Sequence, residues 1–311
     1  MKTLKVKTPA KINLTLEIEG KRPDGFHNIQ SIMQAISIFD LLAIEITDIS
    51  CHCTDDNVIK LSGNSDLIPY DENNLVYKAA KKFLETAGIT NKKISIYIEK
   101  NIPVAAGLAG GSSNAAGTLV GLNKLFDNLL SNEQIDEIAA GLGSDLNFCI
   151  DGGTQFATSR GEVLEKIITP DLNFIVVKPK NLFISAKEAY TKYSQVSPVR
   201  HFEPVSGSAI MRFRNEFGMT SKEISKLLNN DLEKAIINDY PQIQKLKDTL
   251  INAGCLNAMM SGSGPTVFGI CDKDIPLEFI AFAINTSIKT QSGNAAEIFK
   301  ARSINHGVCY E

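Results

Sequence analysis

A run of glycine and other small residues at 103–116 constrains the fold of this chain more than any other segment. Before it, residues 94–98 alternate isoleucine with polar side chains, which predicts a half-buried strand. After it, a helix of small residues is predicted at about 112–126. The glycines let the backbone curl tightly between the two, and the start of the helix offers unpaired N–H groups to an anion. The segment predicts either an anion-binding loop or a plain turn whose serines cap the helix.

The glycine-rich segments of this chain match neither of the two familiar nucleotide-binding loops. A Walker A loop has the pattern G-x-x-x-x-G-K-[ST], and no lysine follows the glycines here. A dinucleotide fingerprint needs G-x-G-x-x-G, and both Gly141-Leu142-Gly143 and Gly262-Ser263-Gly264 lack its third glycine. Both classes of site are therefore excluded.

The rest of the chain predicts a mixed architecture. Strands are expected at 4–8, 12–18, 36–39, 42–46, 174–177, 257–260, 266–270 and 294–301, with a break at Pro9-Ala10 and a turn at 21–25. Helices are expected after Asn74 and at 132–141, 221–229, 231–238, 241–253 and 277–287. Because the pattern changes near residue 160, we predict an α+β fold with two domains, at 1–160 and 161–311. We expect residues 194–218 to form an irregular insertion, and the sequence does not indicate its role.

Charge and hydropathy exclude several classes of protein. The formal net charge of -3 supplies no broad basic surface, so we expect neither nucleic acid nor membrane as a partner. No apolar run approaches the roughly 18 residues of a membrane-spanning helix. No apolar signal-peptide core follows Met1, so we expect a cytoplasmic protein. Cys51-His52-Cys53 lacks the second ligand pair of a zinc site, and no structural metal is expected.

Three short segments carry candidate functional residues. Lys11 and Asn13 fall on one face of a strand, where a lysine serves either an ion pair or a substrate phosphate. Asp145 follows Gly143-Ser144 and could accept a proton from an alcohol or simply cap a helix. The segment at 261–266 is either a hairpin turn or a second glycine-rich loop that approaches the first.

Taken together, these segments resemble the GHMP kinases, named for galactokinase, homoserine kinase, mevalonate kinase and phosphomevalonate kinase. Three family motifs occur in order, at 9–14, 107–116 and 261–266. The resemblance implies a two-domain fold, with a β-rich N-terminal domain that binds ATP and a smaller α/β-sandwich C-terminal domain. It also implies that the ATP phosphates are bound by Pro103, Val104, Ala105, Ala106, Gly107, Leu108, Ala109, Gly110, Gly111, Ser112 and Ser113.

A fourth segment, at 22–27, resembles the R-x-D-G-Y-H motif of the family branch that acts on 4-diphosphocytidyl-2-C-methyl-D-erythritol. This implies ATP-dependent phosphorylation of the 2-hydroxyl of that compound, a step towards isoprenoid precursors. By the same resemblance, Asp145 is the proton acceptor and Lys11 the neighbouring cation, while Asn13, Phe26, His27 and Tyr190 bind the substrate. Tyr190 has a second interpretation, as a helix core residue.

The chain departs from the family pattern at three places. Phe26 replaces a tyrosine, Leu146-Asn147 replaces Val-Pro, and Ala109 interrupts the glycine run, so its backbone is expected in a conformation that alanine tolerates. We expect ATP to arrive with Mg²⁺, held largely by phosphates and water. A monomer or weak homodimer is expected. The alternatives are another GHMP kinase, of the homoserine or mevalonate type, and a non-catalytic nucleotide-binding sensor.

Overall fold

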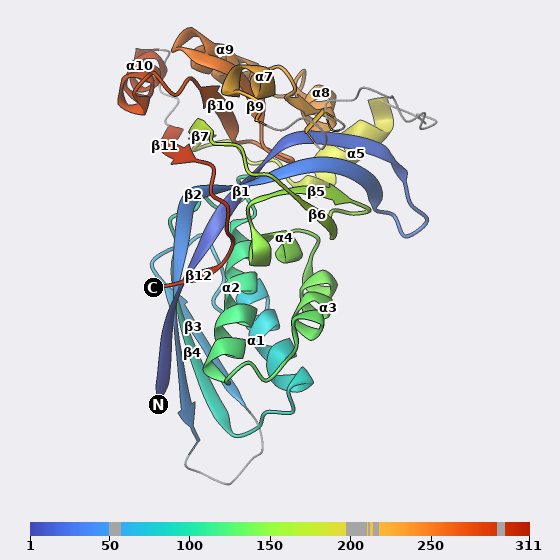
Figure 1. Ribbon diagram of the computed structural model, residues 1–311, viewed down its shortest axis with the longest axis vertical. Helices are drawn as coiled ribbons and strands as arrows, with labels where there is room; N and C mark the ends of the chain where they lie inside the picture. Colours follow the sequence, from blue (N-terminus) through green and yellow to red (C-terminus); the bar gives the residue numbers. More distant parts are fainter. Residues whose placement is uncertain (50–56, 197–209, 211, 214–217, 291–295) are drawn as a thin grey trace.

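The computed structural model describes residues 1–49, 57–196, 210, 212–213, 218–290 and 296–311. Two β-sheets form the frame, and helices cover each of them (Figure 1). The first sheet has the order β12-β1-β2-β4-β3, with β5 paired to β2 and β6, and β8 paired to β1. The second sheet has the order β11-β7-β10-β9. This confirms the α+β organisation, whereas the division at residue 160 stays a prediction.

Two long antiparallel strands, β1 (Lys2–Lys21) and β2 (His27–Asp48), run through the centre of the first sheet. The predicted break at Pro9-Ala10 is wrong, because β1 continues through it. A register shift between these two residues accommodates the proline, which has no N–H to give to the ladder. The predicted strands at 36–39 and 42–46 are likewise parts of one strand.

The other strands of the first sheet are shorter and flank this pair. They are β3 (Val58–Gly63), β4 (Lys92–Glu99), β5 (Thr154–Thr158), β6 (Val163–Ile167), β8 (Asn229–Asn230) and β12 (Cys309–Tyr310). The helices α1 (Leu75–Thr86) and α2 (Gly110–Leu125) lie against one face of this sheet, and α3 (Asn132–Leu142) packs on these two helices (Figure 1). Their apolar side chains form one core cluster with those of β2 and β4.

The second sheet comprises β7 (Asn173–Pro179), β9 (Cys255–Met260), β10 (Val267–Cys271) and β11 (Ala296–Arg302). Side chains alternate along β7: Phe174 and Val176 pack towards β1 and β2, while Ile175 and Val177 pack towards the helices. Those helices are α5 (Ala186–Val196), α8 (Asp231–Ile236), α9 (Pro241–Asn252) and α10 (Leu277–Thr290), with the short α7 (Ser221–Ser225) near β9. The two sheets therefore share a buried apolar layer.

Sequence patterns did not predict β3, β5, β6 or the short helix α4 (Leu146–Asp151). Cys51-His52-Cys53 and most of the stretch at 194–218 lie outside the described residues. Within the part of the chain that the structure describes, no helix is both long and apolar enough to cross a lipid bilayer.

Candidate active site

A cleft of about 750 Å³ opens where the two sheets meet. Its walls come from the β1–β2 hairpin, the loop before α2, the start of α4, the helix α5 and the turn between β9 and β10. The lining residues that carry the argument below are Lys11, Asn13, His27, Asp145, Arg160 and Tyr190. Among all the described residues that line it, Asp145 is the one with a carboxylate.

The glycine-rich segment at 103–113, here called the phosphate loop, takes an unusual backbone path. Ala105, Gly107 and Ala109 all have positive φ, at 50°, 73° and 56°. The expectation that Ala109 adopts a backbone conformation that alanine readily tolerates is therefore wrong. It lies in the left-handed region, which costs a residue with a Cβ roughly 1–2 kcal/mol. Ala109 is also the N-cap of α2, and it makes no capping hydrogen bond through its side chain.

The phosphate loop touches the turn at 261–266, as the second interpretation of that turn expected. Ser261 Oγ donates a hydrogen bond of 3.0 Å to the carbonyl of Gly107. A Cβ at Gly107 would lie 2.2 Å from the carbonyl oxygen of Ser261, so only glycine fits this approach. The two glycine-rich segments therefore form one wall of the cleft.

Only part of the phosphate loop faces the cleft. Gly107, Ala109 and Ser112 line it, whereas the side chains of Ala106 and Leu108 are buried in the core. Ser113, one of the residues implied to bind the ATP phosphates, directs its hydroxyl away from the cleft and donates to the carbonyl of Pro9 at 2.6 Å. The other predicted loop residues, which do not line the cleft, are Pro103, Val104, Ala105, Gly110 and Gly111.

Lys11, Asn13 and Asp145 meet at the base of the cleft. Lys11 Nζ donates to Asn13 Oδ1 at 2.8 Å and lies 3.6 Å from Asp145 Oδ2. Asn13 in turn donates to Ser31 Oγ at 2.8 Å, which fixes the direction of its amide. Asp145 precedes α4 but makes no capping hydrogen bond through its side chain. Its carboxylate is therefore directed to the lysine and the cleft rather than to the helix.

His27 and Tyr190 also line the cleft. Their rings stack with centroids 5.1 Å apart and planes at 24°. His27 Nε2 lies 3.1 Å from Ser194 Oγ, and that hydroxyl donates its one hydrogen to the carbonyl of Tyr190. With the hydroxyl hydrogen on the Tyr190 carbonyl, Nε2 is the donor to Ser194, and Nδ1 of the neutral ring is left as an acceptor. Burial, and to a smaller extent the charge of Lys21, lower the pKa of His27 below its ordinary value of 6.5.

Phe26 lies in the cleft wall. The residue is 54% exposed, and the guanidinium of Arg160 lies 5.2 Å from the centroid of its ring. Arg160 is held by Glu162, which accepts its backbone N–H at 2.8 Å. Sequence reasoning missed Arg160, because nothing near it forms a motif. It also missed the other cations of the wall, Lys21 and Lys187.

No three His, Cys, Asp or Glu side chains converge as metal ligands would within the described ranges. A divalent cation in the cleft would therefore depend on oxygen ligands from phosphates and water, with Asp145 as the nearest protein carboxylate.

Comparison with known proteins identifies the family. Residues 74–156 match the model of the GHMP kinases N terminal domain, and residues 214–289 match that of the GHMP kinases C terminal domain. The chain belongs to the GHMP kinase family, and the two-domain fold expected from the resemblance is confirmed.

Relatives narrow the position within the family. The chain is 40% identical to the 4-diphosphocytidyl-2-C-methyl-D-erythritol kinase of Prochlorococcus marinus subsp. pastoris, over 97% of this chain and 96% of the relative. It is 40% identical to the enzyme of the same name from Clostridioides difficile, over 87% of each chain.

Solved structures agree with this placement. A crystal structure of 4-(cytidine 5'-diphospho)-2C-methyl-D-erythritol kinase has a TM-score of 0.73 at 26% identity, covering 97% of this chain and all of the other. A homoserine kinase from Cytophaga hutchinsonii reaches a TM-score of 0.75, covering 100% and 98%, but at 17% identity it shows the shared fold alone.

Proposed function

We propose that this protein transfers the γ-phosphoryl group of ATP to the 2-hydroxyl of 4-diphosphocytidyl-2-C-methyl-D-erythritol. The observation that carries the proposal is one cleft that holds the phosphate loop, the Lys11–Asp145 pair and the His27–Tyr190 stack. The activity in the names of the relatives at 40% identity supports the same substrate. The protein then acts in isoprenoid precursor synthesis, as a cytoplasmic monomer or weak homodimer.

The Lys11–Asp145 pair performs the chemistry at the acceptor hydroxyl. Asp145 accepts the proton as the oxygen attacks the γ-phosphorus. A carboxylate is a weak base towards an alcohol, so the forming charge on oxygen needs stabilisation from elsewhere. Lys11 supplies it, because its ammonium lies 3.6 Å from the carboxylate and is held in place by Asn13. Positioning and charge neutralisation supply most of the rate in phosphoryl transfer.

The phosphate loop binds the ATP phosphates through the backbone N–H groups at the start of α2, aided by the Ser112 hydroxyl. ATP enters as its Mg²⁺ complex, in which phosphate oxygens and water provide most ligands. Since Asp145 is the one carboxylate among the described lining residues, it is the one anionic protein ligand that they offer to the cation.

His27 gives the cleft its preference for cytosine. The exocyclic amine of cytosine is a hydrogen-bond donor, and Nδ1 of neutral His27 is the free acceptor. Tyr190 supports the imidazole from one side, and Phe26 offers an exposed aromatic face nearby. Lys21, Arg160 and Lys187 place positive charge in the wall that an anionic diphosphate would meet.

The test is ADP release with Mg-ATP and four acceptors: the cytidylyl compound, homoserine, mevalonate and galactose. Turnover confined to the cytidylyl compound supports the proposal. Turnover with another acceptor keeps the ATP site and contradicts the cytosine pocket. A folded protein that binds ATP but turns over none of the four would be a nucleotide sensor.

A further inference from the structure

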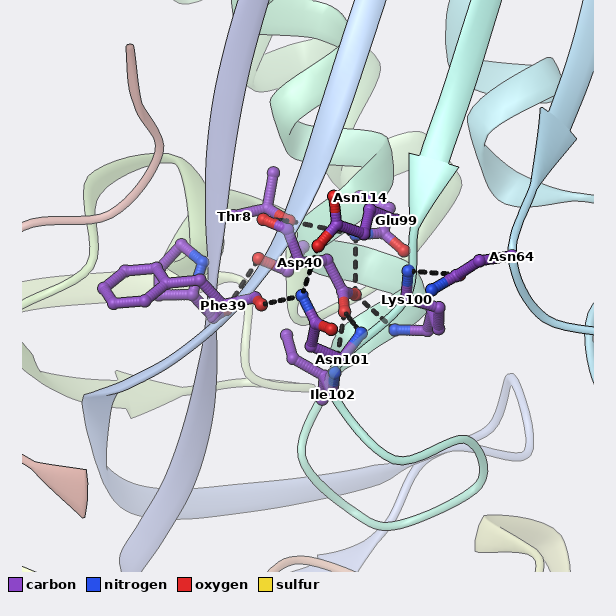
Figure 2. A network of polar contacts seen from close by, with 11 residues as sticks. Thr8, Phe39, Asp40, Asn64, Glu99, Lys100, Asn101, Ile102 and Asn114 are labelled. Carbon is purple, nitrogen blue, oxygen red and sulfur yellow. Dashed lines mark hydrogen bonds and ion pairs between the residues drawn. The ribbon is translucent and has the colours of Figure 1, made fainter. Parts of the chain in front are cut away.

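Asp40, in β2, lies at the centre of a buried polar network beneath the phosphate loop (Figure 2). Its side chain is fully buried. Oδ1 accepts the backbone N–H groups of Asn101 and Ile102, each at 2.7 Å. Oδ2 accepts Asn114 Nδ2 at 2.8 Å and pairs with the ammonium of Lys100. One carboxylate thus receives four donors.

These donors come from the two ends of the phosphate loop. Asn101 and Ile102 immediately precede it, and Asn114 immediately follows it in the first turns of α2. Asn114 Nδ2 also donates to Thr8 Oγ1 at 2.9 Å, which ties the same point to β1. Asp40 therefore joins the entrance and the exit of the loop to the two central strands of the sheet (Figure 2).

Lys100 brings a positive charge directly under the loop. Its side chain is 5% exposed, and a Cβ built on Gly110 would lie 2.7 Å from its Nζ. Burial lowers the pKa of Lys100, and the Asp40 carboxylate works against this lowering. A buried ion pair adds little stability compared with apolar residues of the same volume. The pair therefore calls for an explanation other than the stability of the fold.

The shape of the phosphate loop supplies that explanation. Two of its alanines are left-handed, and the cap residue of α2 offers no side-chain hydrogen bond. Such a loop does not hold its own geometry, yet a phosphate cradle binds well only when its N–H groups are fixed beforehand. External anchors at both ends would provide that rigidity.

We propose that Asp40 is a positioning residue that holds the phosphate loop and the start of α2 in the geometry that binds the triphosphate of ATP. Asp40 does not touch ATP; it acts through Asn101, Ile102 and Asn114. The inference rests on the proposed function of this loop as the ATP site.

The test compares two dissociation constants in the full chain: that of a non-hydrolysable ATP analogue with Mg²⁺, and that of the cytidylyl compound alone. Asp40→Asn keeps the shape but turns an amide towards the Asn114 amide and the Lys100 ammonium. We expect the analogue to bind at least about tenfold more weakly, and the cytidylyl compound to change less than about twofold. Equal weakening of both, or no change for the analogue, would overturn the proposal.

A reciprocal exchange provides the rescue. In the double variant Asp40→Asn with Asn114→Asp, the amide and the carboxylate change places, so the hydrogen bond between the two positions and the net charge of the cluster both return. We expect analogue affinity within about threefold of the wild type. Recovery of thermal stability without recovery of analogue affinity would show a structural role alone and contradict the proposal.

Two further variants keep the test decisive if Asp40→Asn does not fold. Thr8→Val removes one anchor of Asn114 at constant shape, and we expect a loss of analogue affinity of about two- to fivefold. Leu250→Ala, at a buried position of α9, controls for general destabilisation and should leave both dissociation constants unchanged. An unchanged affinity in Thr8→Val, or an equal loss in Leu250→Ala, would count against Asp40.

Binding and turnover separate the two proposals. A wild-type protein that binds the analogue but does not phosphorylate the cytidylyl compound contradicts the proposed function. The role of Asp40 can still be tested in that case, because its test uses dissociation constants alone. A wild-type protein that does not bind the analogue overturns both.

Discussion

At the scale of single residues, the role of Asp145 depends on where its carboxylate points. Aspartate before a helix usually accepts N–H groups from the first turn, and the residue type alone favoured that role as strongly as a catalytic one. Here the side chain makes no capping bond, and it lies 3.6 Å from the ammonium of Lys11. A charge that could have stabilised α4 is instead presented to the cleft.

Replacing Asp145 with asparagine should therefore remove turnover while the substrates still bind. We expect kcat to fall by about 10²–10⁴-fold, the usual contribution of a positioned base, with both dissociation constants within a few-fold of the wild type. Steady-state kinetics and equilibrium binding measure the two effects. Asp151→Asn, at the other end of α4 and paired with Lys166, is the matched control and should retain full activity. Retained turnover in Asp145→Asn would remove this residue from the mechanism.

His27 gives a pH dependence whose direction follows from its lowered pKa. Its neutral ring leaves Nδ1 as an acceptor, and protonation would turn that atom into a donor facing the cytosine amine. Because the pKa lies below 6.5, the neutral form should persist down to that pH, and kcat/KM for the cytidylyl compound should fall only in more acidic solution. Saturating Mg-ATP keeps the titration of ATP out of the profile.

His27→Gln serves as the control, because glutamine has an acceptor but does not titrate. We expect its kcat/KM to be lower by about five- to tenfold at pH 7.5 and to lose the acid limb. An acid limb centred above pH 6.5 in the wild type, or one that persists in His27→Gln, would contradict the assignment.

At the scale of elements, hydropathy patterns predicted whether a segment forms a helix or a strand better than they predicted where it begins and ends. The short apolar runs of β7 and β10 and the apolar period of α3 and α9 are properties of local sequence, and these elements were predicted within a few residues. The continuity of β1 was not predicted, because Pro9 indicates a break unless a neighbouring strand shifts register around it. The left-handed backbone conformation of Ala109 was not predicted either, since only the contacts of the folded loop hold alanine in that region.

The phosphate loop and the turn at 261–266 contact each other at Gly107 and together form one wall of the site. The substitution Gly107→Ala should push these two segments apart. The added methyl would lie 2.2 Å from the Ser261 carbonyl, at a φ of 73°. We expect a loss of at least about 2 kcal/mol in the free energy of unfolding, and a higher KM for ATP. Chemical denaturation and steady-state kinetics measure these.

Gly141→Ala is the matched control in the helix α3. A Cβ there meets nothing within 4 Å, so alanine should stabilise the protein by up to about 1 kcal/mol and leave the kinetics unchanged. If Gly107→Ala proves as harmless as Gly141→Ala, the close approach of the two segments is not needed for binding.

At the scale of the whole molecule, the cleft belongs to neither sheet alone. Motif order placed Lys11, the phosphate loop and Asp145 in one kinase site, because each lies in a short segment with its own chemical signature. It could not place Asp40 or Arg160, whose partners are distant in sequence and whose surroundings carry no motif. The 3.6 Å between Lys11 and Asp145 was equally beyond sequence reasoning, since it depends on how α4 packs against β1.

Asn230 joins the first sheet directly to the second sheet. It pairs with Leu16 in β1, and its side chain caps α8 by accepting the N–H groups of Leu232 and Glu233. Its amide donates to the carbonyls of Met260 and Gly262, each at 2.9 Å. One residue thus links the first sheet through its backbone, and a helix and the glycine-rich turn of the second sheet through its side chain.

Asn230→Ala should therefore affect both stability and catalysis. The lost cap and the two buried carbonyls left without this donor should together cost about 2–4 kcal/mol, and the freed turn should raise KM for both substrates. Ser131→Ala, which removes the capping box of α3 on the surface, should cost only about 1 kcal/mol and leave both KM values unchanged. Denaturant unfolding and steady-state kinetics on the two variants make the comparison. If Asn230→Ala costs no more than Ser131→Ala and leaves both KM values as they were, the link between the halves does not shape the cleft.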